Sequence, residues 1–286
     1  MANRFKTLWL FLLMSGLFMG FGAMFAGRNG LLLAFAAAMA INFFMYWFSA
    51  GMVLRQYNAR EVTQAEAPKL YYIVEELAAR AQIPMPKVYI VDSPALNAFA
   101  TGRNPAHAVV CVTTGIMSVL NEMELKGVLG HELSHVKNYD MLTGTIAAGF
   151  AMAIGLLSHL ARWGAYGGGY GSDGRRRGGN PLLMLLAALV APLVFTLVKL
   201  AITRSREYGA DEDGAKLSGS TEGLASALEK IRDTQMQGLV LPGNQATAHL
   251  MIAPTRLGSS FAELFASHPD INKRIERLRQ MNIYGR

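Results

Sequence analysis

Long runs of apolar residues dominate the beginning of the chain. Residues 7–27 and 31–54 contain no charged side chain, and only the short link RNG separates them. Each run exceeds the roughly 20 residues that an α-helix needs to cross about 30 Å of hydrocarbon. The pattern therefore predicts a transmembrane helical hairpin over residues 1–54, with a tight turn at the link.

Two later apolar runs, residues 141–161 and 181–201, flank a Gly- and Arg-rich loop at 162–180. They predict a second hydrophobic hairpin over residues 141–201. Lys and Arg normally stay on the cytoplasmic side of a membrane, and the arginines at 175–177 would break this rule if both helices crossed. Two alternatives therefore stand: a spanning pair, or a re-entrant pair that lies against the rest of the protein.

The remaining segments, 55–140 and 202–286, mix charged and apolar residues, and we expect them to form one domain in two halves. A helical period over 63–82 predicts a helix. The segments 87–92 and 108–117 are rich in β-branched residues and predict strands.

A further helical period covers residues 117–138, where Asn121 and Glu124 fit a capping box at the start of the helix. Helices outweigh strands in this pattern. The sequence therefore predicts a mainly helical α+β fold in an integral membrane protein with two transmembrane hairpins.

Composition narrows the class of protein. Only 16% of the 286 residues are charged, against about 25% in average soluble chains. The single cysteine, Cys111, excludes an intrachain disulfide and lies in an apolar run typical of a buried strand. The net charge of +7 comes without a nucleic-acid motif or a phosphate-binding loop, so we expect neither nucleic acid nor nucleotide as a partner. Basic residues that face anionic lipid headgroups explain the charge and place the soluble halves on the cytoplasmic side.

The segment HELSH, residues 131–135, is the strongest chemical signal in the chain. On a helix, His131 and His135 lie one turn apart on the same face, so their imidazoles can bind one zinc ion. Glu132 can act as the general base toward an attacking water. The alternative is a chance match on a solvated helix, where two histidines are ordinary surface groups.

A catalytic zinc site needs a third protein ligand and one open position. The best candidate lies in AITRSREYGADEDGAKL, where Glu207 and Asp211 are again four residues apart. We assign Glu207 to the zinc and Asp211 to a hydrogen bond with a ligand histidine. In the alternative, both acids are exposed and pair with Arg204 and Lys216. Three more histidines could bind zinc but have no partner at helical spacing: His107, His159 and His249.

The chain resembles the HtpX membrane metalloproteases, which are bacterial relatives of the CaaX prenyl (type 1) proteases. The resemblance rests on GHELSHVKNYD, a hydrophobic hairpin, TRSREYGAD and SHPDINKRI, in this order. It covers essentially the whole chain and is far more specific than HExxH alone. The sequence departs from the family pattern at Thr203, where Ser is frequent, and at Asp270, where Pro is common.

The resemblance implies a zincin-like metalloprotease domain with one zinc per chain on His131, His135 and Glu207, and Glu132 as general base. It also implies a multi-pass protein of the bacterial inner membrane with its active site facing the cytoplasm. Its role would be to degrade misfolded or damaged membrane proteins under stress. The expected partners are the lipid bilayer and unfolded polypeptides, and a homo-oligomer is allowed but not required.

An endopeptidase also needs a donor that stabilises the tetrahedral oxyanion. His268 in the segment SHPD is the first candidate, and the alternative is that it caps a helix beginning near Pro269. Tyr208 is a weaker candidate donor. Arg204 could instead brace Glu207 or another acid.

We expect the substrate to bind in extended form along an edge strand in the segment LNAFATG. Asn97 and the backbone of Ala98, Ala100 and Thr101 would lie beside it. Main-chain hydrogen bonds of this kind give affinity without a strict sequence preference. A loop without this role is the alternative.

Other membrane zinc proteins fit the sequence less well. A site-2-type protease carries HExxH inside a transmembrane helix, but here charged residues flank the motif. These residues are Glu122, Glu124, Lys126, Lys137 and Asp140. A CaaX-type processing protease would need more spans than four. A non-catalytic zinc-binding scaffold would need four ligands with cysteine prominent, and Cys111 is the only thiol.

Overall fold

A computed structural model describes residues 2–142, 204–239, 252 and 270–283 of the chain. The predicted second hairpin at 141–201 lies outside these residues, apart from its first two positions. The alternatives of a spanning or a re-entrant pair therefore stay predictions.

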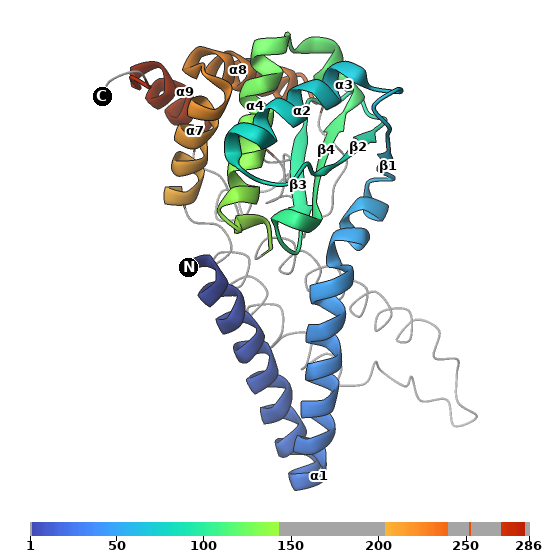
Figure 1. Ribbon diagram of the computed structural model, residues 1–286. Helices are drawn as coiled ribbons and strands as arrows, with labels where there is room; N and C mark the ends of the chain where they lie inside the picture. Colours follow the sequence, from blue (N-terminus) through green and yellow to red (C-terminus); the bar gives the residue numbers. More distant parts are fainter. Residues whose placement is uncertain (1, 143–203, 240–251, 253–269, 284–286) are drawn as a thin grey trace, which may run out of the picture.

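The first helix, α1 (Ala2–Gln56), consists of two arms that meet at one end (Figure 1). Gly27 lies at the reversal with φ of 56°, a left-handed conformation that glycine adopts without a Cβ clash. The Asn42 amide donates to Ser15 Oγ at 2.9 Å, although two residues 27 positions apart would be about 40 Å from each other in a straight helix. A helical hairpin is present, and its turn begins at Gly27, just before the predicted link; that both arms cross a membrane stays a prediction.

One segment of the described chain, Gly27–Gln56, is long and apolar enough to cross a membrane, with a mean hydropathy of 1.9. It forms the second arm of α1. The span predicted for residues 7–27 forms the other arm. Of the four predicted spans, the described residues thus supply this one candidate.

Four strands form a small mixed sheet in the order β1-β2-β4-β3. The strands are β1 (Arg60–Glu61), β2 (Lys87–Val91), β3 (Ala98–Gly102) and β4 (Ala108–Thr113). β2 and β4 run parallel, and the other neighbours are antiparallel. A short 3₁₀ helix, η1 (Pro105–His107), joins β3 to β4.

The strand predicted for 108–117 ends four residues early. Its last four residues belong to the next element, α3 (Thr114–Val119), for which Thr113 is the N-cap. The Thr113 hydroxyl accepts a hydrogen bond from the backbone N–H of Ile116 at 3.3 Å, which satisfies one of the open donors of the first turn. This cap, rather than the apolar character of the run, decides where the strand ends.

The described residues also form five longer helices: α2 (Pro68–Ala81), α4 (Glu122–Lys137), α7 (Arg204–Ser218), α8 (Thr221–Met236) and α9 (Ile271–Gln280). α4 is central, because it contacts α2, α7, α8 and β3 (Figure 1). The fold is a mainly helical α+β fold with one small sheet, as predicted. The second half of the chain therefore packs directly on the helix that carries HELSH.

The main core lies between the sheet and these helices. Leu70, Ile73 and Leu77 of α2 are buried together with Val128 and Leu133 of α4. Burial of each such side chain stabilises the fold by about 1.5–3 kcal/mol. The apolar face of α2 thus helps to hold α4 in place.

Candidate metal centre

The start of α4 is fixed by the predicted capping box. Asn121 Oδ1 accepts a hydrogen bond from the backbone N–H of Glu124 at 2.9 Å, and Glu124 Oε2 accepts one from the N–H of Asn121 at 2.8 Å. Glu124 also accepts bonds from Ser226 at 2.6 Å and Lys230 at 2.7 Å. These contacts join α4 to α8 and set the rotation of the helix that carries the histidines.

Two glycines let α4 and α7 approach closely. A Cβ on Gly130 would lie 2.7 Å from the Gly214 carbonyl oxygen, and a Cβ on Gly214 would lie 2.6 Å from the His131 nitrogen. Any larger residue would push the two backbones apart. The absence of these two side chains brings Glu207 on α7 within reach of the histidines on α4.

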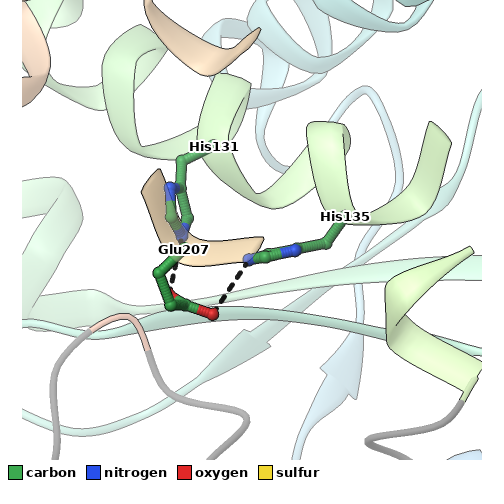
Figure 2. Close-up of side chains that lie close together, drawn as sticks. All are labelled: His131, His135 and Glu207. Carbon is green, nitrogen blue, oxygen red and sulfur yellow. Dashed lines mark ion pairs between the residues drawn. The ribbon is translucent and has the colours of Figure 1, made fainter. Parts of the chain in front are cut away.

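Three side chains converge at this crossing. His131 and His135 both point toward Glu207 (Figure 2), with Nε2-to-carboxylate distances of 3.8 Å in each case. One nitrogen or oxygen atom from each residue lies within 4.8 Å of the others. Ligands around a tetrahedral zinc are about 3.3 Å apart when its bonds are 2.0–2.1 Å long. The three donors therefore fit a zinc ion with a small adjustment.

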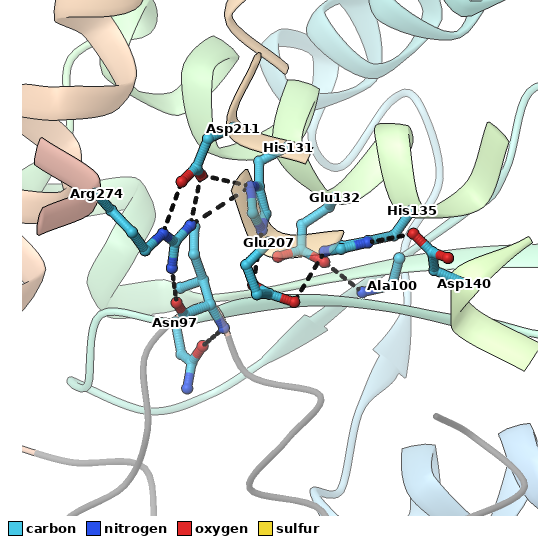
Figure 3. A network of polar contacts seen from close by, with 10 residues as sticks. Asn97, Ala100, His131, Glu132, His135, Asp140, Glu207, Asp211 and Arg274 are labelled. Atoms are coloured by element: carbon cyan, nitrogen blue, oxygen red, sulfur yellow. Dashed lines mark hydrogen bonds and ion pairs between the residues drawn. The ribbon is translucent and has the colours of Figure 1, made fainter. Parts of the chain in front are cut away.

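Each histidine is held by a carboxylate on its other ring nitrogen (Figure 3). His131 Nδ1 lies 2.9 Å from Asp211 Oδ1, and His135 Nδ1 lies 3.1 Å from Asp140 Oδ2. In such a pair the proton stays on Nδ1, so Nε2 keeps its lone pair for a metal. The structure thus brings Asp211 to its predicted position.

Sequence reasoning missed the role of Asp140, which it treated only as one of the charges that flank HELSH. The signal was present, since Asp140 ends the segment GHELSHVKNYD. Arg206 adds a second contact, with Nη1 3.7 Å from Asp140 Oδ1. Arg206 belongs to the segment SREY, so this segment supplies a further contact to the site.

Arg274 is the second residue that sequence reasoning missed. It lies on α9 with 1% of its surface exposed, and it donates to both oxygens of Asp211 at 2.9 and 2.7 Å. A third donor reaches the backbone carbonyl of Ile252 at 3.0 Å. Arg274 belongs to the segment SHPDINKRI, which also supports the HtpX resemblance.

Burial and charge set the protonation of the site. Burial lowers the pKa of His131 to about 4, so this histidine is neutral at pH 7. Burial acts in the same direction on His135, but the hydrogen bond to Asp140 and the charge of Glu207 outweigh it and raise its pKa to about 9. Burial also favours a protonated Asp211, but the charge of Arg274 dominates and lowers its pKa.

Glu132 lies on the same helix with its carboxylate fully buried. Burial raises the pKa of Glu132 to about 8. A divalent cation among these groups would favour neutral histidines and ionised carboxylates by its charge. The donor set of two imidazoles and one carboxylate, with a further carboxylate beside it, therefore suits zinc in both geometry and charge.

β3 passes directly beside this centre and forms an edge of the sheet, so the alternative of a plain loop is wrong. The backbone N–H of Ala100 donates to Glu132 Oε2 at 3.0 Å (Figure 3). In an antiparallel pair of strands, every second residue bonds to the partner strand. The Asn97 carbonyl accepts from the N–H of Thr113 at 3.0 Å, so Asn97 is one of the residues that bond toward β4. Ala98 and Ala100 therefore turn their backbone groups away from β4, and Thr101 turns its own toward β4.

A model of peptidase family M48 matches residues 64–282 of the chain. The chain belongs to peptidase family M48. It is 50% identical over 276 residues to a protease HtpX homolog of Pyrococcus furiosus, covering 96% of this chain and 95% of the relative. The same description applies to relatives in Thermococcus kodakarensis, 48% identical over 279 residues and 96% of both chains, and in Ralstonia pickettii, 46% identical over 283 residues, covering 98% and 97%. The predicted HtpX resemblance is confirmed, and the chain is a metallopeptidase.

One solved structure supports the M48 fold. The crystal structure of Ste24p from S. mikatae matches with a TM-score of 0.54 at 17% identity, covering 97% of this chain and 65% of that chain. At this identity the likeness shows the fold alone.

The exposed-acid alternative for this M48 peptidase is wrong. Glu207 and Asp211 are buried, with 5% and 1% of their surfaces exposed. Lys216, the suggested partner, pairs instead with Glu212 at 2.7 Å. The Arg204 side chain lies outside the described part of the structure, so its bracing role stays a prediction.

The remaining candidates do not join the centre as far as the structure describes them. His107 is exposed, with Nδ1 2.8 Å from Asn104 Oδ1, and His159 and His249 lie outside the described residues. Tyr208 packs under the Arg277 guanidinium, 4.8 Å from its ring centre.

His268 also lies outside the described residues, so its proposed oxyanion role is untested. Its alternative role as a helix cap is wrong. α9 begins at Ile271, and the Asp270 side chain caps it by accepting from the N–H of Asn272 at 2.8 Å. A carboxylate is well suited to that position.

Proposed function

We propose that this M48 peptidase is a zinc-dependent, membrane-bound endopeptidase that degrades misfolded or damaged membrane proteins. One observation carries the catalytic part: two imidazole Nε2 atoms face the Glu207 carboxylate, while Asp211 and Asp140 hold the opposite nitrogens. Evidence for membrane attachment comes from the candidate span Gly27–Gln56.

In this proposal His131, His135 and Glu207 hold one zinc per chain, with Asp211 and Asp140 orienting the two histidines. The ion supplies Lewis acidity to the water and to the scissile carbonyl. Glu132 takes a proton from the attacking water and delivers it to the leaving amine nitrogen. Burial raises the pKa of Glu132 in the absence of an ion, and the charge of a bound cation would lower it, so the carboxylate could accept the proton of the water near neutral pH.

The substrate strand is proposed to pair with the outward N–H of Ala98 and the outward carbonyl of Ala100 on β3. The other two outward groups are bonded within the protein: the Ala98 carbonyl accepts from the N–H of Ile252 at 3.3 Å, and the Ala100 N–H donates to Glu132. Asn97 supports this edge, since its Oδ1 accepts from the N–H of Ile252 at 3.3 Å. Recognition through backbone groups suits unfolded polypeptides, which share exposed main chain rather than a sequence. On the sequence alone, His268 is proposed as the oxyanion donor.

The cellular setting is also part of the proposal. Basic residues in the soluble halves favour an active site on the cytoplasmic face of the cytoplasmic membrane. There the β3 edge would meet the polypeptide segments of damaged membrane proteins as they emerge from the bilayer.

Casein cleavage in detergent by wild type and Glu132→Gln, with zinc content measured in parallel, tests the catalytic proposal. We expect about one zinc per chain in both proteins and a loss of roughly 10²–10⁴-fold in cleavage rate in the variant. Glu75→Gln is the matched control, because Glu75 is exposed on α2 and takes no part in the proposed site. This variant should cleave casein as wild type does.

Two outcomes would contradict the proposal. Undiminished cleavage by Glu132→Gln would exclude Glu132 as the base. Zinc in both proteins without cleavage of casein or of a denatured membrane protein would favour a non-catalytic zinc-binding scaffold.

A further inference from the structure

A cavity of about 780 Å³ lies where the soluble domain meets the second arm of α1. Tyr46 lines it from α1, Gln82 from the end of α2, and Arg103 from the connection between β3 and β4. Lys137 and Tyr139 line it from the C-terminal end of α4. In Figure 1 the β3–β4 connection lies at the end of the domain from which the two arms extend.

The cavity lies at the level of lipid headgroups if the candidate span is inserted in a membrane. Its 30 residues, Gly27–Gln56, form a helix about 45 Å long, while the hydrocarbon core is only about 30 Å thick. If Gly27 is at one boundary of the core, the opposite boundary falls close to Tyr46 and Trp47. Tyr and Trp are enriched at this boundary in membrane proteins.

The charge of the cavity is positive. Two basic side chains, Arg103 and Lys137, line it, and none of the described residues around it is acidic. The Arg103 guanidinium lies over the Trp47 ring at 4.0 Å from its centre, a cation–π contact that holds the charge at the membrane boundary. An anion is the ligand that this environment favours.

Two residues that line the cavity have a positive φ, a backbone conformation that residues other than glycine rarely adopt. Gln82 has φ of 57° and Tyr139 has φ of 60°. Each such conformation costs on the order of 1 kcal/mol or more and persists where the surroundings enforce it. Both residues lie where a helix ends and the chain changes direction, Gln82 after α2 and Tyr139 after α4.

We propose that this cavity binds the phosphate-containing headgroup of an anionic phospholipid. Arg103 and Lys137 provide the charge, and Tyr46 lines the same cavity from α1. A free phosphate ion shares this chemistry. The lipid is favoured because Phe43 and Trp47 expose 62% and 44% of their surfaces on the same arm, where acyl chains would contact them. The inference rests on membrane insertion of α1, but not on peptidase activity.

Native mass spectrometry of the full chain in a neutral detergent can test this assignment. Glu132→Gln would serve as the background to prevent self-cleavage. Phosphatidylglycerol, phosphatidylcholine and glycerol 3-phosphate would be titrated separately. We expect the first phosphatidylglycerol molecule to bind at least tenfold more tightly than phosphatidylcholine or glycerol 3-phosphate. A basic residue near an anionic lipid contributes roughly fivefold, so Arg103→Gln with Lys137→Gln should weaken that binding about 25-fold.

Lys69→Gln with Lys273→Gln is the matched control, because both lysines are exposed and lie outside the cavity. It should bind phosphatidylglycerol as the background does. Lys137→Gln alone, at an exposed position, should show a roughly fivefold loss without a change in melting temperature.

Three results would overturn the proposal. Equal losses in the cavity variant and the control would mean diffuse attraction between charges. Equal binding of the two lipids would exclude an anionic headgroup site. Glycerol 3-phosphate binding as tight as phosphatidylglycerol, and lost in the cavity variant, would identify a soluble phosphate ligand instead. Extraction of the chain from membranes by alkaline carbonate would separately refute insertion of α1.

Discussion

The metal centre depends on which nitrogen of each histidine is available. Asp211 and Asp140 occupy the two Nδ1 atoms, so the lone pairs of both Nε2 atoms face Glu207. Asp211 is itself fully buried, and a buried carboxylate is strongly unfavourable unless a cation compensates it. Arg274 is that cation. The orientation of His131 therefore depends on a series of contacts, from Arg274 to Asp211 and from Asp211 to His131.

At this scale we predict that Arg274→Lys lowers zinc affinity by roughly 10–100-fold. The planar guanidinium makes two bonds to Asp211 and one to the Ile252 carbonyl, and a single ammonium cannot reproduce this geometry. Competition for zinc with a chelator of known affinity would measure the change.

Arg279→Lys on the same helix is the control. Arg279 makes exposed ion pairs with Glu222 and Glu229, so its replacement should leave zinc affinity unchanged. An equal loss in both variants would mean that α9 acts on the site only through general stability.

The sequence was informative about residues whose partners lie one helical turn away. Spacing alone predicted His131 with His135 and Glu207 with Asp211, because a helix fixes the relative direction of such pairs. Arg274 could not be paired in this way. It lies 63 residues from Asp211, and only the packing of α9 against α7 brings them together.

Among the elements, the crossing of α4 and α7 decides whether the donors can meet. Gly130 and Gly214 remove the side chains that would separate the two backbones. The short distance is needed because a Glu side chain on one helix must reach the same ion as two imidazoles on the other.

We predict that Gly214→Ala lowers both stability and zinc content. Its Cβ would lie 2.6 Å from the His131 backbone nitrogen, and overpacking of this kind costs about 1–3 kcal/mol. Gly209→Ala on the same helix has nothing within 4 Å of the new Cβ, so it should be neutral or stabilise by about 0.5–1 kcal/mol. Thermal unfolding and metal analysis of the two variants would measure the difference.

A Gly214→Ala variant that binds zinc and melts like Gly209→Ala would show that the close crossing is not required. The two glycines sit five residues apart on α7, so intrinsic helix propensity is matched between them and only the neighbouring helix differs.

The elements that sequence predicted well have strong local signals. The capping box of Asn121 and Glu124 located the start of α4, and β-branched runs located β2 and β4. The end of β4 was placed too late, because an apolar run does not distinguish a strand from a short helix such as α3. β1 has only two residues and exists through its pairing with β2, which no local pattern reveals.

For the whole molecule, the contact between α4 and α8 joins the two halves of the chain. Glu124 is buried and bonds to Lys230 and Ser226 across more than 100 residues of sequence. Burial favours its neutral form, but the bonds from Lys230, Ser226 and Asn121 outweigh burial and lower the pKa of Glu124 below its ordinary value of 4.5.

We predict a pH-dependent role of this contact in stability. Because the pKa is lowered in the folded state, the ionised Glu124 stabilises the fold above about pH 4.5, and this contribution is lost as the pH falls through the folded-state value. Glu124→Gln keeps the capping bond but removes the charge. It should cost on the order of 1 kcal/mol at pH 7 and much less in acid.

Denaturant unfolding at pH 7 and near pH 3.5, with zinc chelated at both values, would measure these differences. Glu75→Gln is again the exposed control and should show little difference at either pH. An equal cost of Glu124→Gln at both pH values would mean that the ionised pair with Lys230 does not stabilise the fold.

The overall organisation was predictable in outline only. Uncharged runs of sufficient length predicted the hairpin in α1, since few other structures use such runs. The cavity beside it was not predictable, because Tyr46, Gln82, Arg103 and Lys137 come from four separate segments. Their proximity depends on how the domain sits on the arm, which hydropathy does not encode.

The link from Arg274 through Asp211 to His131 also has a consequence for the timing of synthesis. Arg274 and His131 are 143 positions apart, which a ribosome covers in roughly 7 to 30 s at about 5–20 residues per second. During the first part of that interval His131 and His135 exist without Glu207 and Asp211, and throughout it they exist without Arg274, so their site is incomplete. A nascent chain of this peptidase is therefore expected to be inert, and neighbouring polypeptides that are still being inserted meet the enzyme only after it is nearly finished.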